Sequence, residues 1–234
     1  MRLYGLDGCR AGWVAASAPV DDPAAIHIAV IPRLAILFEG EAPGLAGIDM
    51  TIGLPERIGP EGRVPERLIR QVLGPRRSSV FSTPCRAAVY AGDYTEACRL
   101  ARAHSDPPRA LSKQAFNILP KMREIDALLG ARPGLRPLLR EVHPETSFWA
   151  LNGKAPMAHA KKTAEGVAER HAVLRRCGVP AAALATRLKG ATADDVVDAL
   201  AVLQSAFRVW RGEAVVFGAD GDADAFGFPC AISA

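Results

Sequence analysis

The sequence has few cysteines and no long apolar run. Its five cysteines are scattered and never spaced as C-x-x-C, so neither a zinc motif nor a disulfide framework is readable. No stretch of about 18 apolar residues occurs, so no membrane-spanning helix is expected. The amino terminus turns acidic at Asp7, before the apolar core of a secretory signal peptide could form. We therefore expect a cytoplasmic protein with no membrane contact.

Internal repeats, low-complexity segments and the common nucleotide-binding loops are also absent from the sequence. The lack of self-similar blocks of about 20 to 50 residues excludes solenoids. No Walker loop, Ser-His-Asp order or G-x-G-x-x-G fingerprint stands out, and the pair Gly5 and Gly8 lacks the helix start that a phosphate-binding loop needs. Nucleotide binding by a glycine-rich loop is therefore not expected.

What remains is an ordinary globular composition. The 234 residues are 49% hydrophobic and 23% charged, which predicts one domain over residues 1–234 with a core that needs no disulfide or metal. The formal charge is +4, from 29 Lys and Arg against 25 Asp and Glu. So small a surplus is compatible with a nucleic-acid-binding protein and with an enzyme for small anions.

The first fifty residues are typical of an antiparallel meander followed by one more strand. Short apolar runs bounded by turn residues predict three strands, at residues 3–6, 13–16 and 26–31. Gly8 and Gly12 are expected to lie in turns between them. Residues 34–38 predict one or two helical turns, and residues 45–49 predict a fourth strand that ends on Asp49.

The remaining chain predicts an insertion and then mostly helices. Residues 55–110 are rich in Pro, Gly, Arg and Ser, which indicates loops and short helices. Apolar residues follow at helical spacing over residues 111–129, where Pro120 is expected to kink the helix or divide it in two. A fifth strand is expected at residues 138–142. Further helices are expected at 163–177, 181–188 and 193–210, with a short final strand at 213–217. The pattern predicts an α/β fold with a central mixed sheet.

Three acidic residues fall at or just after predicted strands. Asp7 precedes Gly8, and Asp-Gly is also a common turn dipeptide. Asp49 ends an apolar strand, where an acid can simply cap the following turn. Glu145 follows His143 and Pro144 and can equally be solvated. Position in the sequence alone therefore does not decide whether each acid has a local structural role or belongs to a site.

Asp195 and Asp198 lie in a helix that is apolar on nearly every face, which is typical of a buried helix. Thr192 can cap this helix, and Asp195 in its first turn can interact favourably with the helix dipole. These two roles explain the start of the helix without a metal site. Capping does not explain Asp198, because a buried carboxylate must be paired or metal-bound. Residues three apart share a helix face, so Asp195 and Asp198 can point at one ion.

A cluster of carboxylates without sulfur or imidazole ligands suits Mg²⁺ or Mn²⁺. Two such ions about 3.5–4 Å apart can activate water and stabilise the leaving oxygen in an in-line phosphoryl displacement. That chemistry hydrolyses phosphodiester bonds.

The pattern of acids resembles the ribonuclease H-like fold: three strands with an early acid, a fourth strand ending in an acid, and a late helix with Asp-x-x-Asp-Ala. The run 195–201 is similar to the closing helix of RuvC-type Holliday-junction resolvases. Several runs also resemble a domain-of-unknown-function family of predicted ribonuclease H-fold nucleases, and together they span almost the whole chain. These runs are residues 5–13, 48–55, 76–81, 111–114 and 143–153.

This resemblance implies a ribonuclease H-like domain with a five-stranded sheet and an insertion after strand four. It also implies that the acids form a cluster for Mg²⁺ or Mn²⁺, with Asp7 central between two ions. The members of that cluster are Asp7, Asp49, Glu145, Asp195 and Asp198. The sequence departs from the family pattern at Thr51, where Pro is expected, which should alter the loop slightly without removing Asp49.

Five further residues are candidates for contacts with substrate phosphates: Arg76, Arg77, Ser78, Ser79 and Lys113. Guanidinium, ammonium and hydroxyl groups contact phosphate oxygens without reading base sequence. A solvated basic loop explains the same residues without a ligand. His143 is either an orienting group or a structural histidine, and Trp13 and Trp149 are expected in the core rather than as base-stacking platforms.

The sequence therefore predicts a Mg²⁺- or Mn²⁺-dependent nuclease that binds DNA or RNA. The alternative is a non-catalytic module of the same fold that binds a protein or nucleic acid. A phosphotransferase is least favoured, because kinases that share this core duplicate it and the chain has no internal repeat. A junction-cutting enzyme would act as a homodimer, since two symmetric cuts need two sites.

Overall fold

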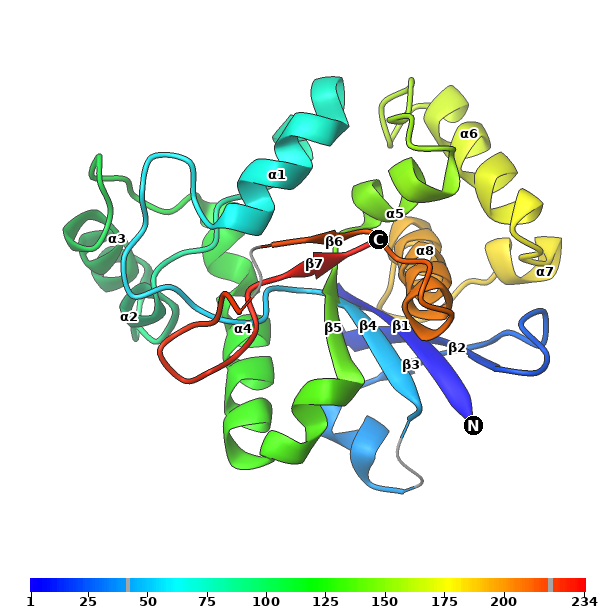
Figure 1. Ribbon diagram of the computed structural model, residues 1–234, viewed down its shortest axis with the longest axis horizontal. Helices are drawn as coiled ribbons and strands as arrows, with labels where there is room; N and C mark the ends of the chain where they lie inside the picture. Colours follow the sequence, from blue (N-terminus) through cyan, green and yellow to red (C-terminus); the bar gives the residue numbers. More distant parts are fainter. Residues whose placement is uncertain (41–42, 219–220) are drawn as a thin grey trace.

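The computed structural model describes residues 1–40, 43–218 and 221–234. Its centre is a seven-stranded sheet with strand order β3-β2-β1-β4-β5-β7-β6 (Figure 1). The strands are β1 (Arg2–Cys9), β2 (Gly12–Pro19), β3 (His27–Ile31), β4 (Leu45–Asp49), β5 (Leu139–Val142), β6 (Val216–Phe217) and β7 (Ile232–Ser233). The first three strands pair antiparallel, β1, β4, β5 and β7 run parallel, and β6 pairs antiparallel with β7.

The predicted α/β class and mixed central sheet are confirmed, but the prediction of five strands is wrong. β6 and β7 extend the sheet beyond β5. Each of these strands has two residues, too few to show the alternation by which a strand is identified in sequence. The final strand expected at residues 213–217 is shortened to β6.

The turn expected around Gly8 is also wrong. β1 continues to Cys9, and within it Asp7 pairs with Val14 on β2 and with Asp49 on β4. Pairing on both sides keeps the backbone extended, so the tight turn to β2 is displaced to residues 10 and 11. Asp7 is therefore a strand residue, held in register with Asp49.

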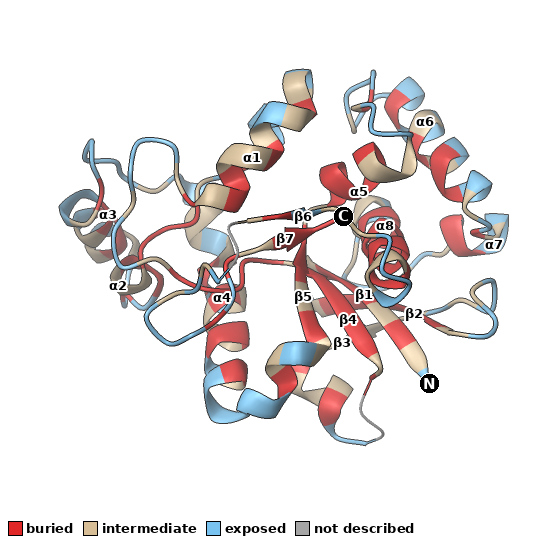
Figure 2. Cartoon of the chain, viewed as in Figure 1, coloured by how far each residue is buried: buried red, intermediate tan, exposed pale blue. Residues whose placement is uncertain are grey.

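The helices cover both faces of the sheet (Figures 1 and 2). In chain order they are η1 (Leu34–Phe38), α1 (Val64–Leu73), η2 (Gly74–Ser79), α2 (Arg86–Val89), α3 (Tyr94–Ala103), α4 (Lys113–Ala131), η3 (Pro133–Leu138), α5 (Pro144–Leu151), α6 (Ala164–Arg176), α7 (Ala181–Leu184) and α8 (Ala193–Trp210). Helix α8 packs on one face with α5 and α6, and α4 packs on the other face with η1. Within the described ranges, no helix has the length and apolarity that crossing a membrane requires.

Alternating side chains of the strands supply two separate cores. Leu3 and Val14 contribute to the core under α8, whereas Leu6 and Ala15 contribute to the core under α4. This alternation follows from the two-residue period of a strand. Helix α8 is buried over most of its length because it lies against the centre of the sheet (Figure 2).

The segment between β4 and α4 carries α1, η2, α2 and α3, so short helices occur where the insertion was expected. Helix α4 is uninterrupted from Lys113 to Ala131, so of the two alternatives expected at Pro120, a kink or a division, the division does not occur. Pro120 has no backbone N–H, so the helix lacks one hydrogen bond there. Burial of Leu119 and Met122, on either side of Pro120, offsets that loss. Helix α5 was not predicted, and α7 ends at Leu184 rather than at Leu188.

Candidate metal centre

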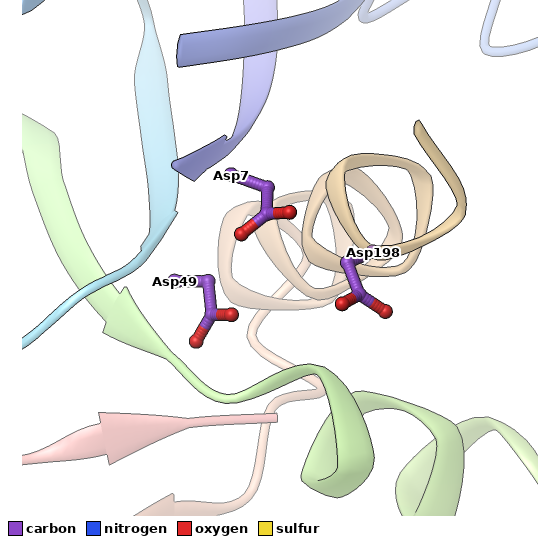
Figure 3. A group of neighbouring side chains, drawn as sticks. All are labelled: Asp7, Asp49 and Asp198. Atoms are coloured by element: carbon purple, nitrogen blue, oxygen red, sulfur yellow. The ribbon is translucent and has the colours of Figure 1, made fainter. Parts of the chain in front are cut away.

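Asp7 and Asp49 lie side by side at one edge of the sheet. They are directly paired across the parallel strands β1 and β4, and each lies near the carboxyl end of its strand. Ligand sites in open α/β sheets lie outside these strand ends. Figure 3 shows both carboxylates directed toward the same space beside α8.

Asp198 joins them from α8, and two glycines allow the close approach of this helix. Gly5 and Gly47 are paired two residues before Asp7 and Asp49, so they lie on the same face of their strands as the acids. A Cβ on Gly5 would lie 2.2 Å from the carbonyl oxygen of Ala199, and a Cβ on Gly47 would lie 2.9 Å from a Val202 methyl carbon. The helix therefore rests on bare backbone next to the acids.

The three carboxylates form one compact group. Each offers an oxygen, and these oxygens all lie within 4.8 Å of one another (Figure 3). Asp7 and Asp198 are buried, and Asp49 is half-buried. Burial and the nearby acids raise the pKa of Asp7 well above its ordinary value, that of Asp49 to about 8 and that of Asp198 to about 6. Three acids so placed require protons or a cation.

Lys161 provides one positive charge and was not among the predicted site residues. Its Nζ bonds to Oδ2 of Asp198 and lies 3.0 Å from Oδ2 of Asp194. Burial lowers the pKa of Lys161, but the two aspartates outweigh burial and raise it. Lys161 lies in an irregular segment between α5 and α6, where no periodic pattern could have identified it.

The two other predicted acids lie near the triad, each with a partner of its own. Asp195 accepts a hydrogen bond from the Thr192 amide at 2.8 Å, in a capping box at the start of α8. Glu145 is buried on α5, where its Oε1 lies 2.5 Å from Nη2 of Arg170. The other oxygen of Glu145 has no hydrogen-bond partner among the described residues. Glu145 therefore keeps one oxygen for a ligand, whereas Asp195 caps its helix.

A cavity of about 270 Å³ opens beside the triad, and we call it the acidic cavity. Its wall contains Asp49, Asp198, Glu145, Lys161, Arg170, Arg76, Ser78, Ser79, His143 and Pro144. Nine buried side-chain polar atoms lack a partner in the described chain, and five belong to residues of this wall: Arg76, His143, Glu145, Arg170 and Asp198. Buried polar groups are normally bonded, so this concentration indicates a place for a polar ligand.

The predicted phosphate-contacting residues divide into two sets. Arg76, Ser78 and Ser79 lie on or next to η2 and line the acidic cavity. Arg77 faces a neighbouring hollow instead. Lys113 begins α4, and its Nζ lies 3.6 Å from the centre of the Tyr94 ring. Lys113 lines neither the acidic cavity nor the neighbouring hollow.

His143 follows β5 and faces the acidic cavity. Its Nε2 lies 3.4 Å from the carbonyl oxygen of Ser79, and burial lowers the pKa of the imidazole, so it is neutral at pH 7. Trp13 and Trp149 are both buried in the core. The indole of Trp13 donates a hydrogen bond to Glu124, and Trp149 packs against Phe217, as expected of core residues.

The chemistry of the triad fits a divalent cation. All its donor atoms are carboxylate oxygens, which suit Mg²⁺ or Mn²⁺. Oδ1 of Asp198 is buried and has no hydrogen-bond partner among the residues that the structure describes, although its other oxygen is bonded to Lys161. An unpaired buried carboxylate oxygen next to two further acids is what a cation would satisfy.

Comparison with protein-family models gives one match, over residues 5–223, to a family described as "Protein of unknown function (DUF429)". Searches of curated proteins and of solved structures gave no significant match. The matched span contains every residue of the triad and of the acidic cavity.

Proposed function

We propose that this chain, which belongs to the DUF429 family, is a Mg²⁺- or Mn²⁺-dependent nuclease that hydrolyses phosphodiester bonds by a two-metal carboxylate mechanism. The observation that carries this proposal is the convergence of Asp7, Asp49 and Asp198 beside a cavity lined with cationic and hydroxyl groups. The acids suit the metal, and the other groups suit the phosphate.

The topology supports the resemblance to the ribonuclease H-like fold. Three antiparallel strands are followed by the parallel additions β4 and β5, and a late helix carries an acid to the strand ends. The segment with short helices follows the fourth strand, as that resemblance implies. Fold alone does not specify activity, so the proposal depends on the site.

The residues have distinct roles in the proposed reaction. Asp7, Asp49 and Asp198 would hold the cations, with Asp7 central, and the free oxygen of Glu145 would hold a second cation or orient the attacking water. When bound, the cations would supply activation of water and stabilisation of the leaving oxygen. Hydrolysis adds water across the P–O bond and leaves a 3′-hydroxyl and a 5′-phosphate.

The basic wall of the acidic cavity would orient the phosphate. Arg76 offers a guanidinium fork, and Ser78 and Ser79 offer hydroxyl groups. Lys161 is part of this wall and pairs with Asp198 of the triad, so its ammonium group can also pair with a phosphate oxygen. Arg170 fixes Glu145 at the other side of the cavity.

A cleavage assay tests this proposal. Purified protein is incubated with single-stranded and duplex DNA and RNA in Mn²⁺, in Mg²⁺ and in EDTA. We expect metal-dependent cleavage that Asp7→Asn reduces at least about a hundredfold, since several kcal/mol of transition-state stabilisation is lost. Asp195→Asn is the matched control, because asparagine can still accept the hydrogen bond from Thr192. Cleavage that Asp7→Asn leaves unchanged would contradict the proposal.

One observation favours the second candidate, a non-catalytic binding module. Lys161 already forms ion pairs with Asp198 and Asp194 and offsets part of the negative charge of the site. If these pairs are permanent, the protein binds no divalent cation and the acidic cavity serves only to bind a partner. Saturable Mn²⁺ binding distinguishes the nuclease from this module.

A further inference from the structure

A second hollow, of about 600 Å³, lies beside the acidic cavity and is strongly basic. Four arginines line it: Arg67, Arg70, Arg77 and Arg109. Among the described residues that line it, Glu61 is the one acid. We call this the arginine hollow. It joins the helix pair α1 and η2 to the segment that follows α3, so residues distant in sequence supply its charge.

Two of these arginines are held by neighbouring groups, and two have no side-chain partner in the described part of the chain. Arg70 donates to the carbonyl oxygen of Glu61 at 2.7 Å and to the hydroxyl of Ser82 at 3.0 Å, and Arg67 lies 3.4 Å from the carboxylate of Glu61. Arg77 and Arg109 are exposed, and their guanidinium groups have no hydrogen bond or ion pair with any residue that the structure describes. Unpaired guanidinium forks in one hollow suit several phosphate groups.

The arginine hollow and the acidic cavity share a wall residue. Ser78 lines both, and Val80 lines the arginine hollow and a small pocket that reaches Asp49 and His143. Phe81 lines the same small pocket and is 40% exposed, so part of its ring is open to solvent. An exposed ring beside a basic groove suits stacking of an unpaired base.

We infer that a single-stranded polynucleotide runs from the acidic cavity over residues 78–82 into the arginine hollow. The ligand class is thus a polymer with several phosphates rather than a mononucleotide. Arg77 and Arg109 bind phosphates beyond the scissile one, and Phe81 stacks on a base between the two hollows. This inference rests on the proposed function for the position of the scissile phosphate. The inference goes beyond the proposed function because it defines the substrate as a single strand and gives its path over the surface.

The test measures binding separately from cleavage. The Asp7→Asn variant, which does not cleave in the proposed scheme, is titrated in EDTA with a fluorescent dinucleotide and with a single strand of about ten nucleotides. We expect the longer strand to bind at least about tenfold more tightly. We expect the double variant Arg77→Ala/Arg109→Ala to lose the preference for the longer strand. The slope of log Kobs against log salt concentration should fall in magnitude by about 1.4, which is about 0.7 for each of two phosphate contacts.

Two further variants make the test specific. Phe81→Ala should weaken binding of the longer strand about fivefold or more and leave the salt slope unchanged, because stacking is not ionic. Arg211→Ala is the matched control, since Arg211 is exposed at the far end of α8 and lines neither hollow. It should change neither value. Circular dichroism verifies that each variant is folded.

Equal affinity for the two ligands, or an unchanged salt slope in the double arginine variant, would overturn the inference. Tighter binding of a duplex of the same length would overturn its single-strand component. Arginine-dependent binding by a wild-type protein that cleaves nothing would support the polymer path and contradict the proposed function, so the two failures are distinguishable.

Discussion

Gly5 and Gly47 are paired directly across β1 and β4, two residues before the paired acids Asp7 and Asp49. Because the glycines have no side chains, α8 contacts the backbone of the sheet at these positions. The paired acids lie two residues further along the strands, where α8 presents Asp198. The position of the candidate metal centre thus depends on backbone contact between α8 and the sheet.

We expect Gly5→Ala to disrupt the fold and the metal centre together. The added Cβ would meet the Ala199 carbonyl oxygen and the Leu203 amide at 2.2 Å, and neither is the end of a flexible side chain. Overpacking of this kind costs about 1–3 kcal/mol or more of unfolding free energy. Gly47→Ala should cost less, since its nearest neighbour is a Val202 methyl group. Urea unfolding of the two variants measures the difference. Equal stability of wild type and Gly5→Ala would show that α8 is not held by this contact.

The metal-free protein should lose stability as pH rises from about 5 to about 8. Burial raises the pKa of Asp49 from 3.8 to about 8, so the folded state binds more protons than the unfolded state within this window. Unfolding free energy therefore falls with increasing pH, by about 1–3 kcal/mol after allowance for solvent at this half-buried group. Asp49→Asn should flatten the dependence. Urea unfolding in EDTA at several pH values measures it, and a stability that rises over the window would contradict the assignment.

Breaking the buried pair between Arg170 and Glu145 should be costly. Arg170→Met leaves Glu145 charged and unpaired in the interior, which costs about 3–5 kcal/mol of unfolding free energy. Arg170→Met combined with Glu145→Leu should recover much of that loss, because no buried charge remains. A double-mutant cycle by urea unfolding measures the coupling. Purely additive effects would mean that the pair contributes nothing.

Lys161→Met should strengthen Mn²⁺ binding. Lys161 competes with a cation for the charge and for Oδ2 of Asp198, so this carboxylate is fully free for the metal only part of the time. If Asp198 is free about a tenth of the time, the apparent Kd falls about tenfold in the variant. Lys162→Met is the matched control, since no hydrogen bond or ion pair joins Lys162 to the described acids. Calorimetry measures both, and weaker binding in Lys161→Met would contradict competition.

The sequence predicted the parts of the site that depend on local pattern. Short apolar runs located β1 and β4, and the apolar α8 marked Asp198 as a buried acid. The parallel register of Asp7 and Asp49 is a tertiary pairing, so the Asp-Gly dipeptide misleadingly favoured a turn. Local propensity was outweighed there by strand pairing on both sides.

The remaining parts depend on contacts between distant segments. Helix α5 contains Thr, Ser, Phe and Trp, which are weak helix formers, and it is stable because it packs against α8. Lys161 meets Asp194 and Asp198 on α8, and Arg170 on α6 meets Glu145 on α5. Both contacts depend on tertiary packing, so no spacing in the sequence predicts these pairs. The arginine hollow likewise gathers residues from separate segments.

The most direct test is titration of Mn²⁺ into the pure protein by calorimetry, because it needs no substrate. Wild type, Asp7→Asn, Asp198→Asn and the control Asp195→Asn are compared at one pH. We predict saturable binding that the first two substitutions weaken at least about tenfold and that Asp195→Asn leaves unchanged, because Asp195 caps α8 rather than joining the triad. Absence of Mn²⁺ binding, or binding indifferent to Asp7→Asn and Asp198→Asn, would contradict the metal centre.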